Sequence, residues 1–240
     1  MKKVFKNPVI VLAAGLIFVA GSGVGATRAA IAYSNSAESV SFETDHLYVD
    51  IQEKQDGKFV SVTALGLNDV KNQINKDNPL QVEHEYDEDV QIQNTSTGDY
   101  DEYVRVLVRK SWVDSKGEKD TRLDPSLIEL NTTDSWMKLD SESTTEGEVF
   151  YCTKPLAKDE AVQFLDSIEF SRDILNEVTT ETVSSGDYTV VKNIYGYDGK
   201  KFEIEIRVDA VQAHNAEESI LGAWGVHATV DSNGNITNIN

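Results

Sequence analysis

Residue types that carry out catalysis or bind metals are scattered along this chain and do not stand at functional spacings. Its four histidines and single cysteine lack the His-Glu-x-x-His and paired-cysteine patterns that zinc sites use. These residues are His46, His84, His214, His227 and Cys152. Ser135 and Lys138 match a Ser-x-x-Lys pattern of penicillin-recognising enzymes, but that pattern works on a helix with companion motifs, and this segment has a strand pattern. We therefore expect no metal ligands, no catalytic residues and no enzymatic activity.

Carboxylates are the remaining candidates for chemistry. Residues 83–89 and 99–102 are acid-rich and could hold calcium, although a solvated acidic loop has the same composition. Residues 231–235 begin like an EF-hand loop, but Ile236 occupies the position that needs glycine. Paired carboxylates for glycoside hydrolysis are a further alternative, because an acidic β-sandwich offers many pairs and no pattern selects one. We expect no cofactor, with calcium at the two acidic clusters as the alternative.

The charge balance restricts the partners of this chain. It contains 41 aspartates and glutamates against 22 lysines and arginines, which gives a net charge of -19. Residues 1–32 contain four positive charges and no negative one, so their removal changes the net charge from -19 to -23. Such a surface repels nucleic-acid phosphates and anionic lipids. We expect no nucleic-acid partner and no binding to a bare membrane.

The first 32 residues have the pattern of a cleaved export signal. Lysines precede an apolar run over residues 9–20, which is shorter than the roughly 20 residues that a membrane span needs. Ala30 and Ala32 form a small-x-small exit, so we expect a signal peptidase to cut before Tyr33, with a cut after Ala29 or Ala30 as the alternative. A retained membrane anchor is a second alternative, because residues 21–26 are weakly apolar. The expected mature protein is secreted and has no stable membrane span.

Alternation of apolar and polar residues dominates the mature chain and predicts β-strands. It is clearest over residues 201–211 and around residues 104–108. Shorter strand patterns cover residues 40–42, 47–51, 59–65, 80–86, 90–93, 136–139, 148–153 and 161–170, and residues 225–240 have a hairpin pattern. Short helices are expected at 68–75, 171–178 and 216–223, the last with Asn215 as N-cap. The sequence thus predicts an all-β fold, an antiparallel jelly roll or β-sandwich, in one domain over residues 46–240.

The aromatic residues and the cysteine indicate packing more than chemistry. We expect the large aromatic side chains in the core or between the sheets. They are Trp112, Trp136, Trp224, Tyr86, Tyr103, Phe150, Phe164 and Phe202. Cys152 follows an apolar segment, so we expect a buried structural thiol, and a single cysteine allows no internal disulfide. A carbohydrate-binding face is the alternative for the aromatics, and it would show as two coplanar, exposed rings.

Several stretches resemble one family of exported proteins. They are residues 25–34 around the processing site, residues 102–106 leading to Trp112, residues 123–128, Trp136, and residues 211–225. In these stretches the sequence resembles the TasA and camelysin family of exported biofilm-matrix proteins, whose members use a signal peptidase of the SipW type, and especially its clostridial BsaA-like branch. Residues 141–185 match nothing in that family, and no protease motif is present.

The resemblance implies a jelly-roll subunit of a Gram-positive bacterium that polymerises outside the cell into a biofilm-matrix fibre or a pilus-like polymer. Its expected partners are further copies of itself, the SipW-type peptidase and other matrix components. In such assembly the freed N-terminal segment, residues 33–45, would complete a sheet of the next subunit as a donor strand. The donor residues would be Tyr33, Ala37, Val40 and Phe42. An exposed sheet edge offers the unpaired backbone groups that such a strand requires.

Two other functions fit the composition and stay as alternatives. The first is a monomeric cell-surface adhesin or carbohydrate-binding module, which binds through loops or exposed aromatic rings on a sandwich. The second is a secreted hydrolase, which needs a concave pocket that holds carboxylates with shifted pKa values.

Overall fold

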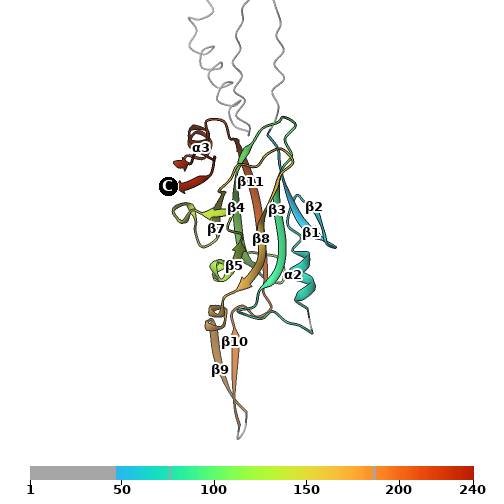
Figure 1. Ribbon diagram of the computed structural model, residues 1–240. Helices are drawn as coiled ribbons and strands as arrows, with labels where there is room; N and C mark the ends of the chain where they lie inside the picture. The colour runs from blue at the N-terminus through green and yellow to red at the C-terminus, as the bar shows by residue number, and fades with distance from the viewer. Residues whose placement is uncertain (1–46, 76, 186–187) are drawn as a thin grey trace, which may run out of the picture. The chain divides into compact units, whose positions relative to one another are not determined.

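The computed structural model describes residues 47–75, 77–185 and 188–240 (Figure 1). The expected signal segment, the processing residues Ala30, Ala32 and Tyr33, and the donor residues Ala37, Val40 and Phe42 lie outside the described residues. Thr44–Asn240 is one compact unit with its own hydrophobic core. None of the helices in the described part is long and apolar enough to cross a membrane.

Two antiparallel sheets make up the body of this unit, and the predicted all-β sandwich is confirmed. The five-stranded sheet has the order β2 (Lys58–Ser61), β1 (Val49–Gln55), β3 (Tyr86–Asn94), β8 (Ala161–Phe170), β5 (Ile128–Thr132). The four-stranded sheet has the order β11 (Lys201–Gln212), β4 (Glu102–Val113), β7 (Gly147–Cys152), β6 (Trp136–Lys138). Two separate ribbons are β9 (Val178–Ser185) with β10 (Tyr188–Tyr195), and β12 (Ala228–Val230) with β13 (Ile236–Ile239). The helices are α2 (Asn68–Gln73), α3 (Ala216–Trp224) and the 3-10 turns η2 (Pro125–Leu127), η3 (Asp140–Glu142) and η4 (Arg172–Asn176).

The main core lies between the two sheets. Side chains at every second position of β4, such as Val104, Val106 and Val108, point inward and are buried, as a period of two requires. They meet inward-facing residues of β3 and β8, including Phe164 and Phe170. The rings of this core meet edge to face or tilted, the preferred geometries for packed aromatics. The expected core positions of the aromatic residues are confirmed, with Phe202 partly buried against the core.

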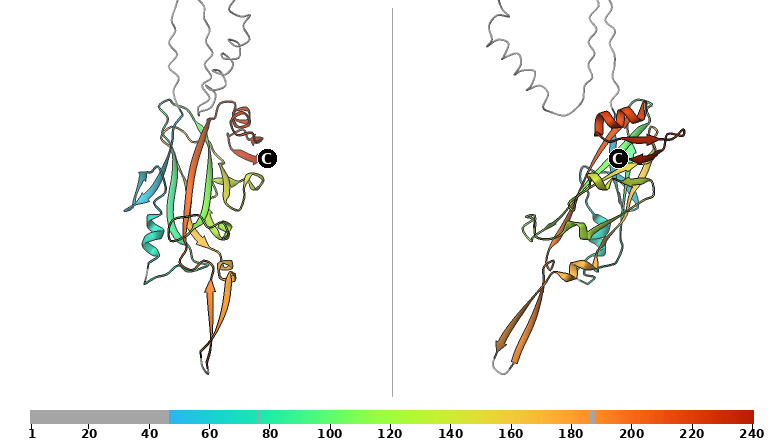
Figure 2. Two further views of the ribbon diagram at one scale, coloured as in Figure 1. Left: turned by 180° about the vertical axis from the view of Figure 1, so that it is seen from behind. Right: turned by 90° about the vertical axis from the view of Figure 1, so that its left-hand side faces the viewer.

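A second apolar layer covers one end of the outer face of the four-stranded sheet. Helix α3 and the β12–β13 hairpin pack there against Tyr103 and Tyr151 through Ile220, Trp224 and Ile236. The Tyr103 hydroxyl donates a hydrogen bond of 2.6 Å to the carbonyl oxygen of Gly234 in the hairpin turn. The hairpin predicted at the C-terminus is therefore confirmed, although it packs on the sheet and does not extend it. The other end of this outer face stays open (Figure 2).

Three predicted elements differ from the structure for identifiable local reasons. The strand expected at 80–86 forms only from Tyr86, because the chain turns at Glu83 with a φ of 56° and the Gln81 N–H donates to the Tyr86 hydroxyl. The strand expected at 59–65 ends at Ser61. The helix expected at 171–178 is only the 3-10 turn η4, after which the chain continues as strand β9.

Asn215 occupies the N-cap position of α3, as predicted, but it does not cap the helix through its side chain. Asn215 has a left-handed backbone with a φ of 51°, and its side chain makes no capping hydrogen bond. Glu217 in the first turn accepts a hydrogen bond of 3.0 Å from the Val230 N–H, so it ties α3 to the C-terminal hairpin.

Candidate functional site: an open sheet edge

The histidines that sequence analysis considered for metal binding stay apart. His84, His214 and His227 are exposed on three different segments, and His46 lies outside the described residues. Within the part of the chain that the structure describes, no three His, Cys, Asp or Glu side chains gather as a metal site. Lys138 lies in strand β6, and its Nζ bonds to Glu148 at 2.6 Å, so the Ser-x-x-Lys pattern is part of a strand.

The two acidic clusters do not point their carboxylates at a common centre. In residues 83–89 the side chain of Glu88 is buried while Asp87 on the neighbouring position is exposed, because successive residues of β3 face opposite sides. Asp89 pairs with Lys54 at 2.6 Å. In residues 99–102 only Glu102 is buried, where it accepts a hydrogen bond from Ser96.

Glu53 and Glu88 form a buried carboxyl pair that joins β1 and β3 to the loop before α2. Glu53 accepts hydrogen bonds from the N–H groups of Gly66 and Asn68, and Glu88 accepts one from the Val70 N–H at 3.1 Å. Burial raises the pKa of Glu88 to about 8, and the adjacent Glu53 adds to this rise. Burial also raises the pKa of Glu53, but hydrogen bonds, first of all from Gly66 and Glu88, outweigh it and lower that pKa below its usual value. At neutral pH Glu88 therefore holds a proton next to an ionised Glu53.

Cys152 is the buried structural thiol that the sequence predicts. Its side chain is 0% exposed on the inner face of β7, and burial raises its pKa to about 11. A thiol that is neutral and inaccessible does not act as a nucleophile.

The feature that the structure adds is an unpaired edge of the four-stranded sheet. Strand β11 pairs with β4 along its whole length, from Lys201 opposite Val113 to Gln212 opposite Glu102. Among the described residues, no strand pairs with the other side of β11. We call this unpaired side of residues 201–212 the β11 edge. At twelve residues, β11 matches β4 as the longest strand of the described fold.

The strand register shows which backbone groups this edge offers. Glu102 exchanges backbone hydrogen bonds with Leu156, and the Lys110 N–H donates to Glu146, so even-numbered residues of β4 direct their backbone groups away from β11. In an antiparallel pair, directly opposite residues behave alike. Because even positions of β11 lie opposite even positions of β4, their N–H and C=O groups point out of the sheet at the β11 edge. These residues are Phe202, Ile204, Ile206, Val208, Ala210 and Gln212.

At the β11 edge the core between the two sheets is incompletely covered. Phe202, Ile206, Val208 and Ala210 face the core but are only half-buried, whereas their partners on β4, Trp112, Val108, Val106 and Val104, are buried. Across the gap, Val49 and Ile51 of β1 and Leu65 after β2 are half-buried as well. The β11 edge therefore combines unpaired backbone groups with incompletely covered apolar side chains.

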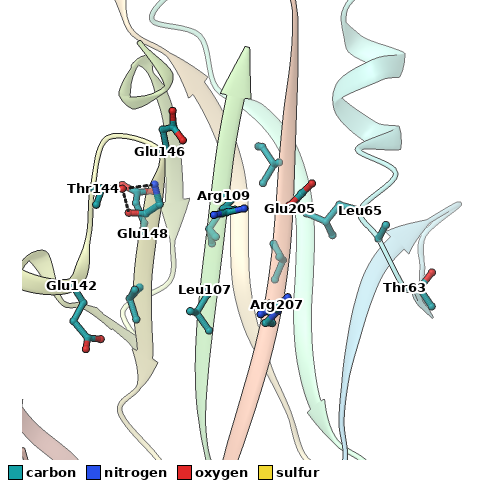
Figure 3. A pocket seen from close by; sticks show the side chains of 16 residues that line it. Thr63, Leu65, Leu107, Arg109, Glu142, Thr144, Glu146, Glu148, Glu205 and Arg207 are labelled. Carbon is teal, nitrogen blue, oxygen red and sulfur yellow. Dashed lines mark hydrogen bonds between the residues drawn. The ribbon is translucent and has the colours of Figure 1, made fainter. Parts of the chain in front are cut away.

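A trough of about 720 Å³ runs beside this edge (Figure 3). Leu65, Ile204 and Ile206 line it where the two sheets separate. Leu107, Arg109 and Arg207 continue it across the open part of the outer face, with glutamates on the opposite wall. The buried carboxyl groups with a raised pKa, Glu88 and Glu102, do not line this trough.

Among residues 47–75, 77–185 and 188–240, no two exposed aromatic rings stack on each other. In the described residues the ring pairs are edge-to-face or tilted and belong to the core or its borders. The most exposed rings, Tyr48, Phe59 and Tyr195, belong to three different segments.

No family model, curated protein or solved structure matches this chain. The sequence led us to expect a sheet edge that pairs with the donor strand of another copy, but it did not identify the strand at that edge. The strand itself was evident, because the regular alternation over 201–211 with charges at every second position is typical of a strand with one wet face, but alternation does not show which strand lies at a sheet edge.

Proposed function

We propose that this chain is a secreted, non-enzymatic structural subunit of an extracellular biofilm-matrix fibre or pilus-like polymer. After a SipW-type signal peptidase cuts before Tyr33, the freed N-terminal segment adds a strand to the β11 edge of a neighbouring copy. The observation that supports this function is the β11 edge, with its outward backbone groups and half-buried apolar side chains.

The chemistry of the donor segment fits this acceptor. Residues 33–43 contain no proline, so each of them can donate a backbone hydrogen bond to a neighbouring strand. In an extended strand Val40 and Phe42 lie on the same face, because they are two residues apart. That face can cover the half-buried Ile206 and Val208 while the donor backbone pairs with the β11 edge. A segment that leaves one copy and enters the next makes a head-to-tail contact, which produces filaments and not closed rings.

The test compares two lengths of the chain, one edge variant and one control variant by electron microscopy. Residues 33–240 should form fibres, and residues 44–240, which lack the donor segment, should not. Val208→Lys places a charge at the half-buried edge and should abolish fibres of residues 33–240. The matched control is Val230→Lys, an equally half-buried valine in β12 outside the β11 edge, which should keep them.

Circular dichroism and thermal unfolding separate a blocked edge from a loss of folding in these variants. The proposal is contradicted if residues 33–240 form no fibres, if residues 44–240 form them equally well, or if folded Val208→Lys still polymerises. A strictly monomeric protein that binds glycans on an array would instead support the adhesin or carbohydrate-binding alternative.

A further inference from the structure

The β9–β10 ribbon projects from the end of the sandwich (Figure 1, Figure 2). Its two eight-residue strands pair with each other, and neither joins one of the two large sheets. The base of the ribbon is fixed to the body, because the Gly196 N–H donates to the Glu177 carbonyl at 2.7 Å and the Tyr197 ring packs edge to face on Trp112. The ribbon is therefore held in position, yet it extends beyond the core that stabilises the rest of the fold.

The strand register divides the ribbon into two faces of different character. One face is formed by opposite pairs at every second position, and none of its eight side chains carries a charge; we call it the uncharged face. Its residues are Val178, Thr180, Thr182, Ser184, Thr189, Val191, Asn193 and Tyr195. A cross-strand hydrogen bond of 3.1 Å from the Thr180 hydroxyl to the Asn193 side chain places two of them together. The opposite face also holds apolar residues, among them Val190 and Ile194, but it differs in charge, because Lys192 lies there across from Glu181.

The uncharged face exposes apolar surface that an isolated ribbon cannot bury. Val191 is 61% exposed, Tyr195 44% and Val178 43%. A two-stranded ribbon is marginally stable in water and becomes stable when a further layer covers a hydrophobic face. β-branched and aromatic residues at these positions fit a pleated surface that packs against another one.

The charge of the whole chain indicates which partner fits. Two copies of a chain with a net charge of -19 repel each other over most of their surface. A contact through the uncharged face places no like charges opposite each other and removes apolar area from water. A two-fold contact requires one surface that complements itself, and a flat face of valine, threonine and tyrosine meets that condition. A strongly basic partner, by contrast, would find no charge to pair with on this face.

We propose that two copies of this chain associate through the uncharged faces of their β9–β10 ribbons, which stack in a symmetric, two-fold contact. This contact is separate from donor-strand exchange at the β11 edge. In a polymer it joins one filament to another, because the ribbon strands pair only with each other and leave the β11 edge available for donor-strand exchange.

Analytical ultracentrifugation of residues 44–240 tests this proposal without the donor segment. We expect a reversible dimer that tightens as the salt concentration rises, because salt screens the repulsion between two acidic bodies. Val191→Glu places a charge on the uncharged face. It should raise the dissociation constant of the dimer at least about tenfold, because it buries an unpaired carboxylate in the contact. Val191 is exposed in the single copy, so the substitution leaves the fold intact.

Val190→Glu is the matched control, because it adds the same charge on the same strand but on the opposite face, at a valine that is 54% exposed. It should change the dissociation constant of the dimer by no more than about twofold. A monomer at all concentrations, or equal weakening by both substitutions, would overturn the proposal. Because residues 44–240 lack the donor segment, neither result depends on whether the longer chain forms fibres. In residues 33–240, Val191→Glu should leave single filaments and remove their lateral bundling.

Discussion

The buried proton on Glu88 should make the stability of this protein fall as the pH rises. The substitution that tests this is Glu88→Gln, which keeps the shape of a protonated carboxyl group, with an amide that can donate toward Glu53 and a carbonyl that can accept from the Val70 N–H. In the folded protein the pKa of Glu88 is raised from 4.5 to about 8. Between those values the folded state keeps a proton that the unfolded state has released, so each pH unit upward lowers the free energy of unfolding.

The magnitude follows from the pKa difference. Within this window, one titrating group lowers the free energy of unfolding by at most about 1.4 kcal/mol for each pH unit. Over the window from 4.5 to about 8 the upper limit is about 5 kcal/mol, and we expect roughly 3 kcal/mol after allowing for solvent screening near the loop. The stabilisation is fully present below pH 4.5 and is lost as the pH passes 8. The lowered pKa of Glu53 acts in the opposite sense, with stability that is lost only at acid pH.

Urea unfolding of residues 44–240 between pH 5 and pH 9 measures this effect. The unsubstituted protein should lose stability with rising pH, and Glu88→Gln should remove most of the slope and be the more stable of the two at pH 9. Glu85→Gln, the same change at an exposed carboxylate three residues away, should keep the slope. If the free energy of unfolding falls equally steeply with pH in all three proteins, Glu88 does not hold a buried proton beside an ionised Glu53.

Three further results are expected. Cys152 should react with a thiol reagent only as fast as the protein unfolds, because it is buried and its pKa is raised to about 11, and rapid labelling of the folded protein would contradict this. Tyr103→Phe should lower the free energy of unfolding by about 1 kcal/mol through loss of the hydroxyl bond to Gly234, measured by urea unfolding against Tyr195→Phe, the same change at an exposed tyrosine. Lys110→Ala should destabilise by about 2 kcal/mol, because it removes the ion pair with Glu148 at 3.1 Å and the hydrogen bond to the Ile128 carbonyl while Lys138 still pairs with Glu148, and a loss below about 0.5 kcal/mol would show that this ion pair is not needed.

The sheets were predictable where one face is wet and the other is buried. The alternation over residues 201–211 corresponds to β11, and the apolar run around 104–108 corresponds to the central strand β4. The core positions of Trp112, Tyr86 and Phe164 follow from size and hydrophobicity. These predictions rest on the alternation of apolar and polar residues. The alternation matches the folded chain because one face of each strand is buried and the other is exposed to water.

The misplaced elements depend on interactions that periodicity does not record. Residues 80–85 have the composition of a strand, but the left-handed turn at Glu83 and the tertiary contact of Gln81 with Tyr86 hold them in a loop. The β9–β10 ribbon was missed, although two threonine- and valine-rich runs flank Gly186 and Asp187, a pair typical of hairpin turns.

The β11 edge could be predicted only in part. The strand itself is evident from sequence, but its place at the border of a sheet depends on pairing between positions 88 apart at one end, Val113 with Lys201, and 110 apart at the other, Glu102 with Gln212. Sequence periodicity carries no information on which neighbour a strand has. The same holds for the uncharged face, since its definition requires the register of β9 against β10.

The central claim is that the β11 edge accepts the N-terminal segment of another copy. Its most direct test is hydrogen exchange on residues 44–240 in the presence of a synthetic peptide of residues 33–43. We predict that the outward N–H groups of Ile204, Ile206 and Val208 become protected when the peptide is added, while N–H groups on β5, an edge of the other sheet, do not change. Absence of binding, or protection of β5 in place of β11, would contradict the account.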